Sequence, residues 1–299
     1  MKEKTALVTG ATSGIGEAIA EGLAKRGAKT LLVSRSEDKC RSVAERLRQI
    51  TGNERVSYYV ADLSSRADVN RLTAQLNNEL GRLDVLINNA GAWFKERQES
   101  ADGVEMTWAL NHLGYFSLTH GLTELLRRTA SEYGEARVIN QSSLSHKQEG
   151  EMHWDDLEFH NWSEAKGTFG NGWGAYSQSK LANVLHAFAL ARKLEGTGVT
   201  ANAVHPGVVV TGFTQNNGLL YKTVAPLRRL FNRSTPADGA APALYLATAP
   251  EAAGITGVYY GPPQEREVPN PVVEDEAAQE RLWDLSLQQL KLGRLPVKA

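Results

Sequence analysis

The sequence predicts a doubly wound α/β fold, with a seven-stranded parallel sheet and helices on both of its faces. Short apolar runs of strand length alternate with longer segments in which apolar residues recur every three or four positions. Continuous apolar runs are typical of buried parallel strands, and the wider spacing places an apolar stripe on one helix face. Their alternation indicates right-handed crossovers that lay helices on both sides of a sheet.

Seven apolar runs are expected to form the strands, in the order Ala6–Val8, Thr30–Val33, Val56–Val60, Leu83–Ile87, Val138–Ile139, Val199–Val204 and Val258–Tyr260. Spaced apolar residues mark helices after the first, fourth and fifth runs: Ile15, Ile19 and Leu23, then Leu118, Leu122 and Leu125, then Leu181, Leu185 and Phe188. Each set falls on one face of a helix.

We expect residues 1–299 to form a single domain, because no change of composition divides the chain. Two long segments break the alternation, at about 144–174 and about 212–236, and loops of this length are usually functional. We expect both to border the substrate, the first through its aromatic residues. A C-terminal extension, about 262–299, is expected to carry a short helix with Leu282, Trp283, Leu285 and Leu290 that packs back on the domain.

Composition restricts the classes of partner. The 33 basic and 34 acidic residues leave a net charge of −1, so neither nucleic acid nor an anionic membrane surface is expected as a partner. The single cysteine, Cys40, cannot form an internal disulfide and fits a reducing compartment. Because the sequence shows neither a signal-peptide pattern nor an apolar run of membrane-helix length, we expect a cytoplasmic protein without a membrane anchor.

A glycine-rich segment follows the first strand and opens the first helix. Its residues are Thr9-Gly10-Ala11-Thr12-Ser13-Gly14-Ile15-Gly16. Glycines permit a tight turn and a close approach of the backbone to a pyrophosphate, which the helix N-terminus stabilises. The segment predicts a dinucleotide cradle of the Rossmann type, although by itself it leaves open a glycine-rich turn without a ligand.

The end of the second strand predicts the cofactor. NAD enzymes place a carboxylate there to bind the ribose 2′-hydroxyl, whereas this strand ends Val33-Ser34-Arg35-Ser36. The Arg35 guanidinium can bind a 2′-phosphate through charge-assisted hydrogen bonds. We therefore expect NADP(H), and the alternative is that Arg35 is an ordinary solvated side chain.

Tyr176 and Lys180 are the expected catalytic pair. They lie four positions apart on a predicted helix, so both side chains project from one face. A neighbouring ammonium is expected to lower the pKa of the phenol, which lets tyrosine exchange a proton with a carbonyl or alkoxide. Tyrosine and lysine at this spacing also occur by chance, so the pair depends on the other motifs.

The ordered set of motifs resembles the short-chain dehydrogenase/reductase superfamily. After the glycine segment come Asp62, Asn88-Asn89-Ala90-Gly91, Asn111, Ser142-Ser143, Tyr176 with Lys180, and Pro206-Gly207. Local sequence is similar to the retinol-dehydrogenase-like branch at Ala109–Gly114, Ser179–Asn183 and Gly196–Val208. Gln141 departs from that branch, which usually has an apolar residue before the serine pair.

The resemblance implies a catalytic tetrad. Ser143 would hydrogen-bond the substrate oxygen, Tyr176 would exchange the proton, Lys180 would tune Tyr176 and hold the nicotinamide ribose, and Asn111 would seat a water behind the lysine. The implied cofactor contacts, with those of the glycine segment and Arg35, are Gly10, Thr12, Ser13, Gly14, Ile15, Gly16, Arg35, Asp62, Leu63, Asn89, Gly91, Tyr176, Lys180, Pro206, Gly207, Val209 and Thr211.

The expected function is reversible hydride transfer between NADP(H) and an apolar carbonyl or alcohol substrate. The alternative is a non-catalytic NADP(H)-binding regulatory protein on the same fold. No metal site is expected, because His146, His153 and His160 recur every seven residues without carboxylates or thiols at ligand spacing. The resemblance implies pairing into a homodimer or homotetramer through the helices that hold Asn111 and Tyr176.

Overall fold

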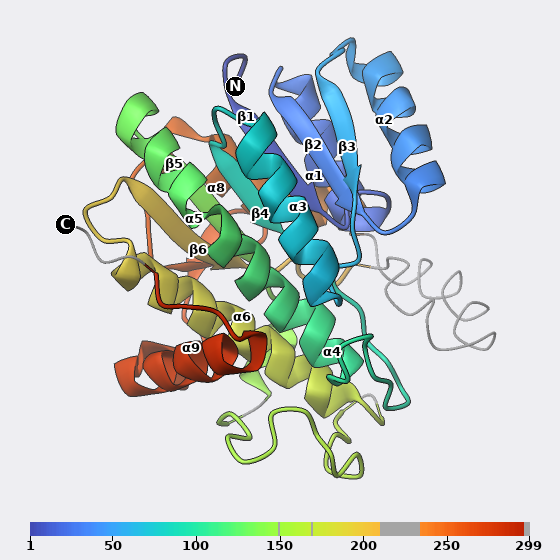
Figure 1. The fold of residues 1–299 in the computed structure, drawn as a ribbon, viewed down its shortest axis with the longest axis vertical. Helices are drawn as coiled ribbons and strands as arrows, with labels where there is room; N and C mark the ends of the chain where they lie inside the picture. Colours follow the sequence, from blue (N-terminus) through green and yellow to red (C-terminus); the bar gives the residue numbers. More distant parts are fainter. Residues whose placement is uncertain (149, 169, 210–233, 296–299) are drawn as a thin grey trace.

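The computed structural model describes residues 1–148, 150–168, 170–209 and 234–295 (Figure 1). Its helices and strands are β1 (Thr5–Thr9), α1 (Gly14–Lys25), β2 (Lys29–Ser34), α2 (Glu37–Thr51), β3 (Val56–Val60), α3 (Arg66–Glu79), β4 (Val85–Asn88), α4 (Met106–Trp108), η1 (Ala109–Leu113), α5 (Gly114–Tyr133), β5 (Ala136–Gln141), η2 (Leu144–Lys147), α6 (Trp173–Lys193), β6 (Val199–Val204), α8 (Pro236–Thr248), η4 (Pro250–Ala252), β7 (Tyr259–Gly261), β8 (Glu265–Glu267), η5 (Pro271–Glu274) and α9 (Glu276–Leu290).

The strands form one sheet in the order β3-β2-β1-β4-β5-β6-β7-β8. The strands from β1 to β7 pair in parallel, as the sequence predicts, and the doubly wound α/β class is confirmed. The predicted count of seven is wrong, because an eighth strand, β8, pairs antiparallel with β7 at the sheet edge. Its sequence, Glu265-Arg266-Glu267, is fully charged, and a short edge strand needs no apolar run.

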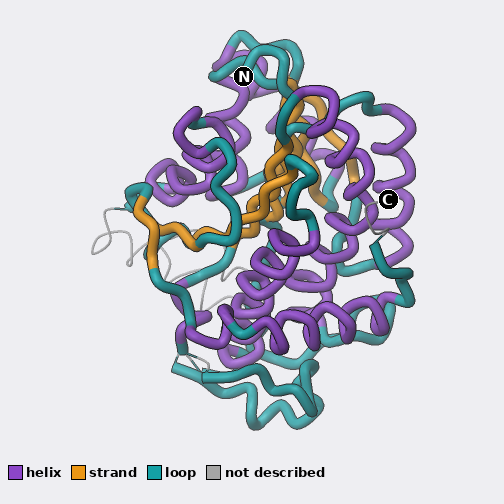
Figure 2. The backbone as a smooth tube through the Cα atoms, turned by 90° about the vertical axis from the view of Figure 1, so that its left-hand side faces the viewer, coloured by secondary structure: helices purple, strands orange, loops and turns teal. Residues whose placement is uncertain are grey.

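Alternate residues of each strand face opposite layers of helices. Leu7 and Leu31 belong to the apolar core under α3, α5 and α6, whereas Ala6 and Leu32 belong to the core under α1, α2 and α8. Figure 2 shows the strands with helices on both sides. Burial on both faces explains why these strands read as continuous apolar runs rather than as alternating ones.

The order in which strands are added to the sheet reverses between β1 and β4. From β1 the chain builds outward through β2 to β3, then crosses back to place β4 on the other side of β1. In open parallel sheets, ligands bind outside the carboxyl ends of the strands at such a switch point. The glycine segment after β1 and the Asn88–Gly91 segment after β4 therefore face each other there.

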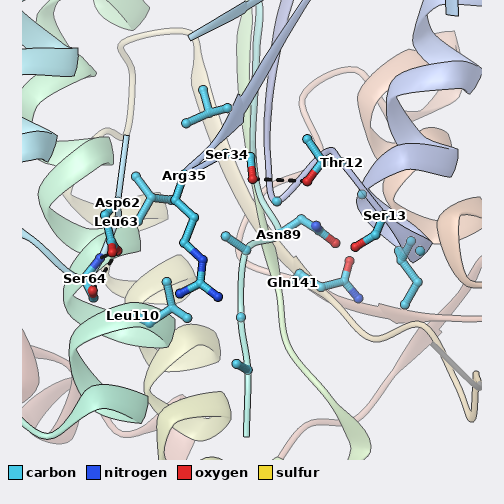
Figure 3. A pocket seen from close by; sticks show the side chains of 18 of the residues that line it. Thr12, Ser13, Ser34, Arg35, Asp62, Leu63, Ser64, Asn89, Leu110 and Gln141 are labelled. Carbon is cyan, nitrogen blue, oxygen red and sulfur yellow. Dashed lines mark hydrogen bonds between the residues drawn. The ribbon is translucent and has the colours of Figure 1, made fainter. Parts of the chain in front are cut away.

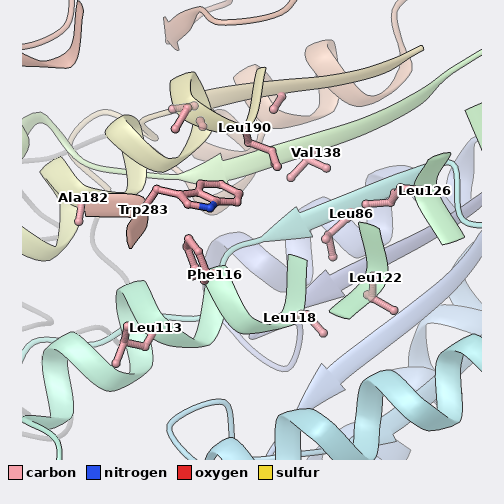
Figure 4. Close-up of a cluster of buried hydrophobic side chains, with 14 of the residues drawn as sticks. Leu86, Leu113, Phe116, Leu118, Leu122, Leu126, Val138, Ala182, Leu190 and Trp283 are labelled. Carbon is pink, nitrogen blue, oxygen red and sulfur yellow. The ribbon is translucent and has the colours of Figure 1, made fainter. Parts of the chain in front are cut away.

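The last helix, α9, packs across α5 and α6. Trp283 of α9 lies against Phe116 of α5, with 4.7 Å between ring centroids (Figure 4). It also lies against His186 of α6, at 5.8 Å. The hydroxyl of Ser286 lies 2.8 Å from His112 Nε2. This face of α5 and α6 is thus covered within the chain, so the expected pairing of subunits would need another surface or a displaced α9.

Two further observations concern the described residues. None of their helices is long and apolar enough to cross a membrane. They also contain no group of three or more histidine, cysteine, aspartate or glutamate side chains placed to hold a metal ion.

Candidate active site

A cleft at the carboxyl ends of β1, β2, β4 and β5 brings together most of the predicted cofactor residues (Figure 3). Those that line it are Gly10, Thr12, Ser13, Gly14, Ile15, Gly16, Arg35, Asp62, Leu63, Asn89, Gly91, Tyr176, Lys180 and Pro206. Gly207 and Val209 are described but do not line it, and Thr211 lies outside the described residues.

The glycine segment fits a dinucleotide because its backbone is packed too tightly for side chains. Gly10 has a φ of +64°, and a β-carbon there would lie 2.8 Å from Ala90 Cα. A β-carbon on Gly16 would overlap the Gly10 carbonyl and the Asn89 amide. The Asn89 amide itself donates to the Thr9 carbonyl at 2.9 Å and so ties this segment to the end of β4.

We expect Gly16→Ala to weaken cofactor binding and the fold together. The added methyl group must displace Gly10 or Asn89, and overpacking of this kind costs about 1–3 kcal/mol. Fluorescence titration with NADPH should show roughly tenfold weaker binding, at the low end of that cost, and thermal unfolding should show a lower Tm. Gly81→Ala is the control, because nothing lies within 4 Å of its added β-carbon. Equal behaviour of the two variants would contradict the tight cradle.

The other end of the cleft carries two cations. Arg35 follows β2, and its side chain extends into the cleft beside Asp62 and Leu63 (Figure 3). Lys39, on the first turn of α2, lines the same end. The Ser34 hydroxyl lies 3.1 Å from the Thr12 hydroxyl and joins β2 to the glycine segment. This arrangement can bind an anionic group attached to an adenosine ribose.

Tyr176 and Lys180 project from α6 into the inner end of the cleft, where both are buried. Burial raises the pKa of Tyr176 to about 12, and a hydrogen bond with the Ser143 side chain acts in the opposite direction. Burial lowers the pKa of Lys180 to about 7. The Lys180 ammonium donates to the Gln141 carbonyl at 3.2 Å and lies 5.7 Å from the centroid of the Tyr176 ring.

The pKa of Tyr176 therefore departs from the sequence-based expectation. The spacing predicts that Lys180 lowers the pKa of the phenol, whereas in the structure desolvation dominates and raises it. Burial removes both groups from water and disfavours the charged form of each, so the lysine is less charged as well. A neutral phenol at neutral pH is suited to donating a proton rather than to accepting one.

The two candidate serines have different partners. The Ser142 hydroxyl donates to the Lys180 carbonyl at 2.8 Å, inside α6, so its role is structural. The Ser143 side chain instead hydrogen-bonds Tyr176 and accepts from the Ser145 backbone N–H at 3.2 Å. This geometry places Ser143, and not Ser142, beside the Tyr176 hydroxyl.

Asn111 lies in a π-helical turn, η1, a distortion that is common at functional sites. Its side chain is fully buried; Oδ1 accepts from the Ala92 N–H at 2.9 Å, and Nδ2 donates to the Ala92 carbonyl and to the Ser179 hydroxyl. A β-carbon on Gly91 would lie 3.1 Å from both Asn111 Oδ1 and Lys180 Nζ. Asn111 thus connects the end of β4 to α6, beside the lysine.

The aromatic segment 144–174 contributes less to the cleft than expected. None of its described residues lines the cleft. Phe159 and Trp162 pack in a small cluster of their own, whereas Trp173, at the start of α6, lies 5.0 Å from the Tyr176 ring, centroid to centroid. The second expected segment, about 212–236, lies outside the described residues except at 234–236.

Sequence reasoning missed several residues that line the cleft. Lys39 lies four positions after Arg35, in the first turn of α2, and this nearness in sequence could have indicated it. Phe94, Met106 and Leu110 form an apolar part of the lining. They belong to an irregular segment, to the short helix α4 and to the turn η1, and no periodic pattern marks them there.

We expect Lys180→Met to stabilise the protein in the absence of cofactor. The folded-state pKa of Lys180 lies below its ordinary value, so wild-type stability falls as the pH decreases from 10.5 to about 7. Methionine removes this dependence and should raise the free energy of unfolding by about 0.5–2 kcal/mol at neutral pH. Urea unfolding across this pH range measures the difference, which should shrink at high pH. The same gain in Lys166→Met, at an exposed position, would contradict burial as the cause.

Comparison with known proteins finds the family that the motifs resemble. A family model described as short chain dehydrogenase matches residues 4–154. Human retinol dehydrogenase 13 is 39% identical over 285 residues, which cover 94% of this chain and 82% of that protein. The chloroplastic short-chain dehydrogenase TIC 32 B of Brassica napus is 36% identical over 293 residues, covering 96% and 88%.

Solved structures share the fold. A crystal structure of an uncharacterised protein from Mycobacterium paratuberculosis has a TM-score of 0.74 at 28% identity, covering 98% of this chain and 96% of that one. The Pseudomonas aeruginosa RhlG/NADP active-site complex has a TM-score of 0.69 at 30% identity, covering 88% and 96%. The chain belongs to the short-chain dehydrogenase family, in its retinol-dehydrogenase-like branch.

Proposed function

We propose that this protein is an NADP(H)-dependent oxidoreductase that interconverts an apolar carbonyl compound and its alcohol. The observation that carries the proposal is that one cleft is lined both by Tyr176 and Lys180, beside the end of β5, and by Arg35 and Lys39, after β2. Strands β1 and β4 lie between these two strand ends. A dinucleotide bound along the glycine segment would reach from one end to the other.

The side chains at the inner end fit proton transfer to a carbonyl. A bound nicotinamide cofactor supplies the hydride that the substrate carbon receives. The Tyr176 hydroxyl donates its proton to the substrate oxygen, and the Ser143 hydroxyl donates a hydrogen bond to the same atom. Lys180 would return a proton to Tyr176 after the transfer and would hold the nicotinamide ribose, while Asn111 fixes the backbone of Ala92.

An apolar substrate is supported by the lining and by the relatives. Phe94, Met106 and Leu110 present apolar surface to the cleft, and such surfaces bind apolar ligands. Human retinol dehydrogenases 13 and 14 are among the relatives. We propose retinoid-like or other apolar aldehydes as the first substrates to test.

NADP(H) is supported by the cations of Arg35 and Lys39, since Arg35 and not a carboxylate directly follows β2. Related structures contain both cofactors: RhlG is a complex with NADP, and a 3-ketoacyl reductase from Brucella melitensis is complexed with NADH. Measurement of turnover with each cofactor on a panel of aldehydes, ketones and alcohols tests the proposal. Binding of NADPH with no turnover on any of them would instead favour the regulatory protein.

The proposal places the protein in a reducing compartment such as the cytoplasm. The cysteine Cys40 is free and buried, which fits this compartment. Its subunits are proposed to form a dimer or tetramer through a surface other than the one that α9 covers. Analytical ultracentrifugation tests the assembly, and a monomer at micromolar concentration would refute it.

A further inference from the structure

A second polar cluster lies next to the Pro206–Gly207 turn and the turn after Ser143, and the proposed mechanism does not use it. His205 follows β6, and its Nε2 lies 2.7 Å from Glu267 Oε1 at the end of β8. The other carboxylate oxygen of Glu267 accepts from Lys147 Nζ at 3.1 Å. Lys147 belongs to η2, the turn that follows Ser143. One carboxylate therefore joins two loops that come from different strands.

Hydrogen bonding fixes the protonation of His205. The backbone N–H of Gly207 donates to His205 Nδ1 at 3.0 Å, so this nitrogen carries no proton. The proton of the neutral ring then lies on Nε2, from which it is donated to Glu267. Burial lowers the pKa of His205, although Glu267 acts to raise it. Glu267 thus holds the imidazole in the tautomer that can accept from Gly207.

Space for this pair depends on Gly261, the last residue of β7. A β-carbon on Gly261 would overlap both Glu267 Oε1 and His205 Nε2. Its φ is not among the positive values of the described glycines, so its backbone does not require glycine. The missing side chain at Gly261 is therefore explained by the contact between His205 and Glu267.

The same cluster holds the backbone of Ser143. The His146 ring donates from Nδ1 to the Ser143 carbonyl at 2.7 Å and accepts from the Asn270 N–H at Nε2, at 3.2 Å. The Tyr259 ring packs against both imidazoles, 4.6 Å from His146 and 5.4 Å from His205 between centroids. The loop after β5 and the turn after β6 are thus held by one packed unit.

We propose that Glu267 and His205 are positioning residues that fix the Pro206–Gly207 turn against the Ser143 segment. Pro206 lines the cleft, and Ser143 hydrogen-bonds the proposed proton donor. The inference rests on the proposed function, because the geometry that it fixes is that of hydride and proton transfer. A misplacement of about 1 Å can cost roughly a hundredfold in rate, so the pair acts on kcat rather than on binding at the adenosine end.

The first test compares two alanine variants of β8. Glu267→Ala should lower kcat by about tenfold or more and leave the Kd for NADPH, measured by fluorescence without substrate, close to that of wild type. Glu265→Ala is the matched control, because this exposed glutamate on the same strand does not contact His205. A wild-type kcat in Glu267→Ala, or an equal loss in the control, would overturn the proposal.

A double-mutant cycle tests whether the pair acts as a unit. Gly261→Ala inserts a methyl group between the two side chains without changing any charge, so it should lower kcat as Glu267→Ala does. The effects should not add in the double variant, because each change breaks the same contact. Additive losses would show that Glu267 affects the rate by another route, and they would overturn the proposal that His205 and Glu267 act as a positioning pair.

The third test requires no turnover and so separates this inference from the proposed function. Nitrogen-15 NMR of the histidine rings should show one neutral histidine protonated on Nε2 that disappears in His205→Asn. Its signals should shift in Glu267→Ala and stay unchanged in Glu265→Ala. Protonation of His205 on Nδ1, or no response to Glu267→Ala, overturns the positioning pair. An intact signature in a protein without oxidoreductase activity refutes the proposed function alone.

Discussion

Tyr176→Phe should abolish turnover while NADPH still binds. The substitution removes the hydroxyl group that we propose as the proton donor and leaves the glycine segment and Arg35 in place. General acid–base catalysis is typically worth about 10²–10⁴ in rate, so kcat should fall by at least about a hundredfold. Fluorescence titration should show the affinity for NADPH changed by less than about fivefold, the value of one neutral hydrogen bond.

The control for this variant is Tyr133→Phe. Tyr133 ends α5, is 50% exposed and packs its ring against the Arg82 guanidinium, an interaction that phenylalanine retains. Its turnover should equal that of wild type. Activity of Tyr176→Phe within about tenfold of wild type would remove Tyr176 from the role of proton donor, because that role is typically worth more.

The fold could be predicted because its signal is local and repeated. Each buried strand reads as an apolar run, and each helix after it carries an apolar stripe, as in Leu118, Leu122 and Leu125 of α5, all of which are buried. Strand β8 was missed for the opposite reason. Its residues are charged, and it exists because β7 offers it an edge to pair with.

The candidate site was predictable as a set of motifs, but its energetics were not. The four-residue spacing of Tyr176 and Lys180 places both on one face of α6, yet it carries no information on burial, which sets the pKa of each. The roles of Ser142 and Ser143 also depend on which way each hydroxyl points. That direction follows from contacts with α6 more than 30 positions away along the chain.

No sequence pattern indicated the hydrogen-bonded side chains that lie far apart along the chain. His205 and Glu267 are 62 positions apart, and nothing in the charged segment after β7 distinguishes Glu267 from Glu265. His146 was noted only as a member of an evenly spaced set of histidines, whereas its ring holds the Ser143 carbonyl. Such contacts become visible only when the sheet places β5, β6, β7 and β8 side by side.

The environment of Arg35 indicates that its charge is available to a ligand. Glu37 and Asp38 follow closely and could neutralise it, but both pair with Arg41, at 2.8 Å and 3.4 Å. Arg35 is exposed and forms no hydrogen bond or ion pair with the residues that the structure describes. Its side chain lies instead in the cleft, on the same side as Lys39.

Arg35→Ala should therefore raise the KM for NADPH and leave the KM for NADH nearly unchanged. Loss of a charged hydrogen bond costs about 1.5–3 kcal/mol, which corresponds to roughly ten- to a hundredfold. The wild-type preference should weaken with added salt, because the contact is exposed to solvent. Arg26→Ala is the control, since the exposed Arg26 follows α1 and does not line the cleft. A wild-type preference for NADH, or an Arg35→Ala variant that binds NADPH as wild type does, would show that the cofactor is not selected by this arginine.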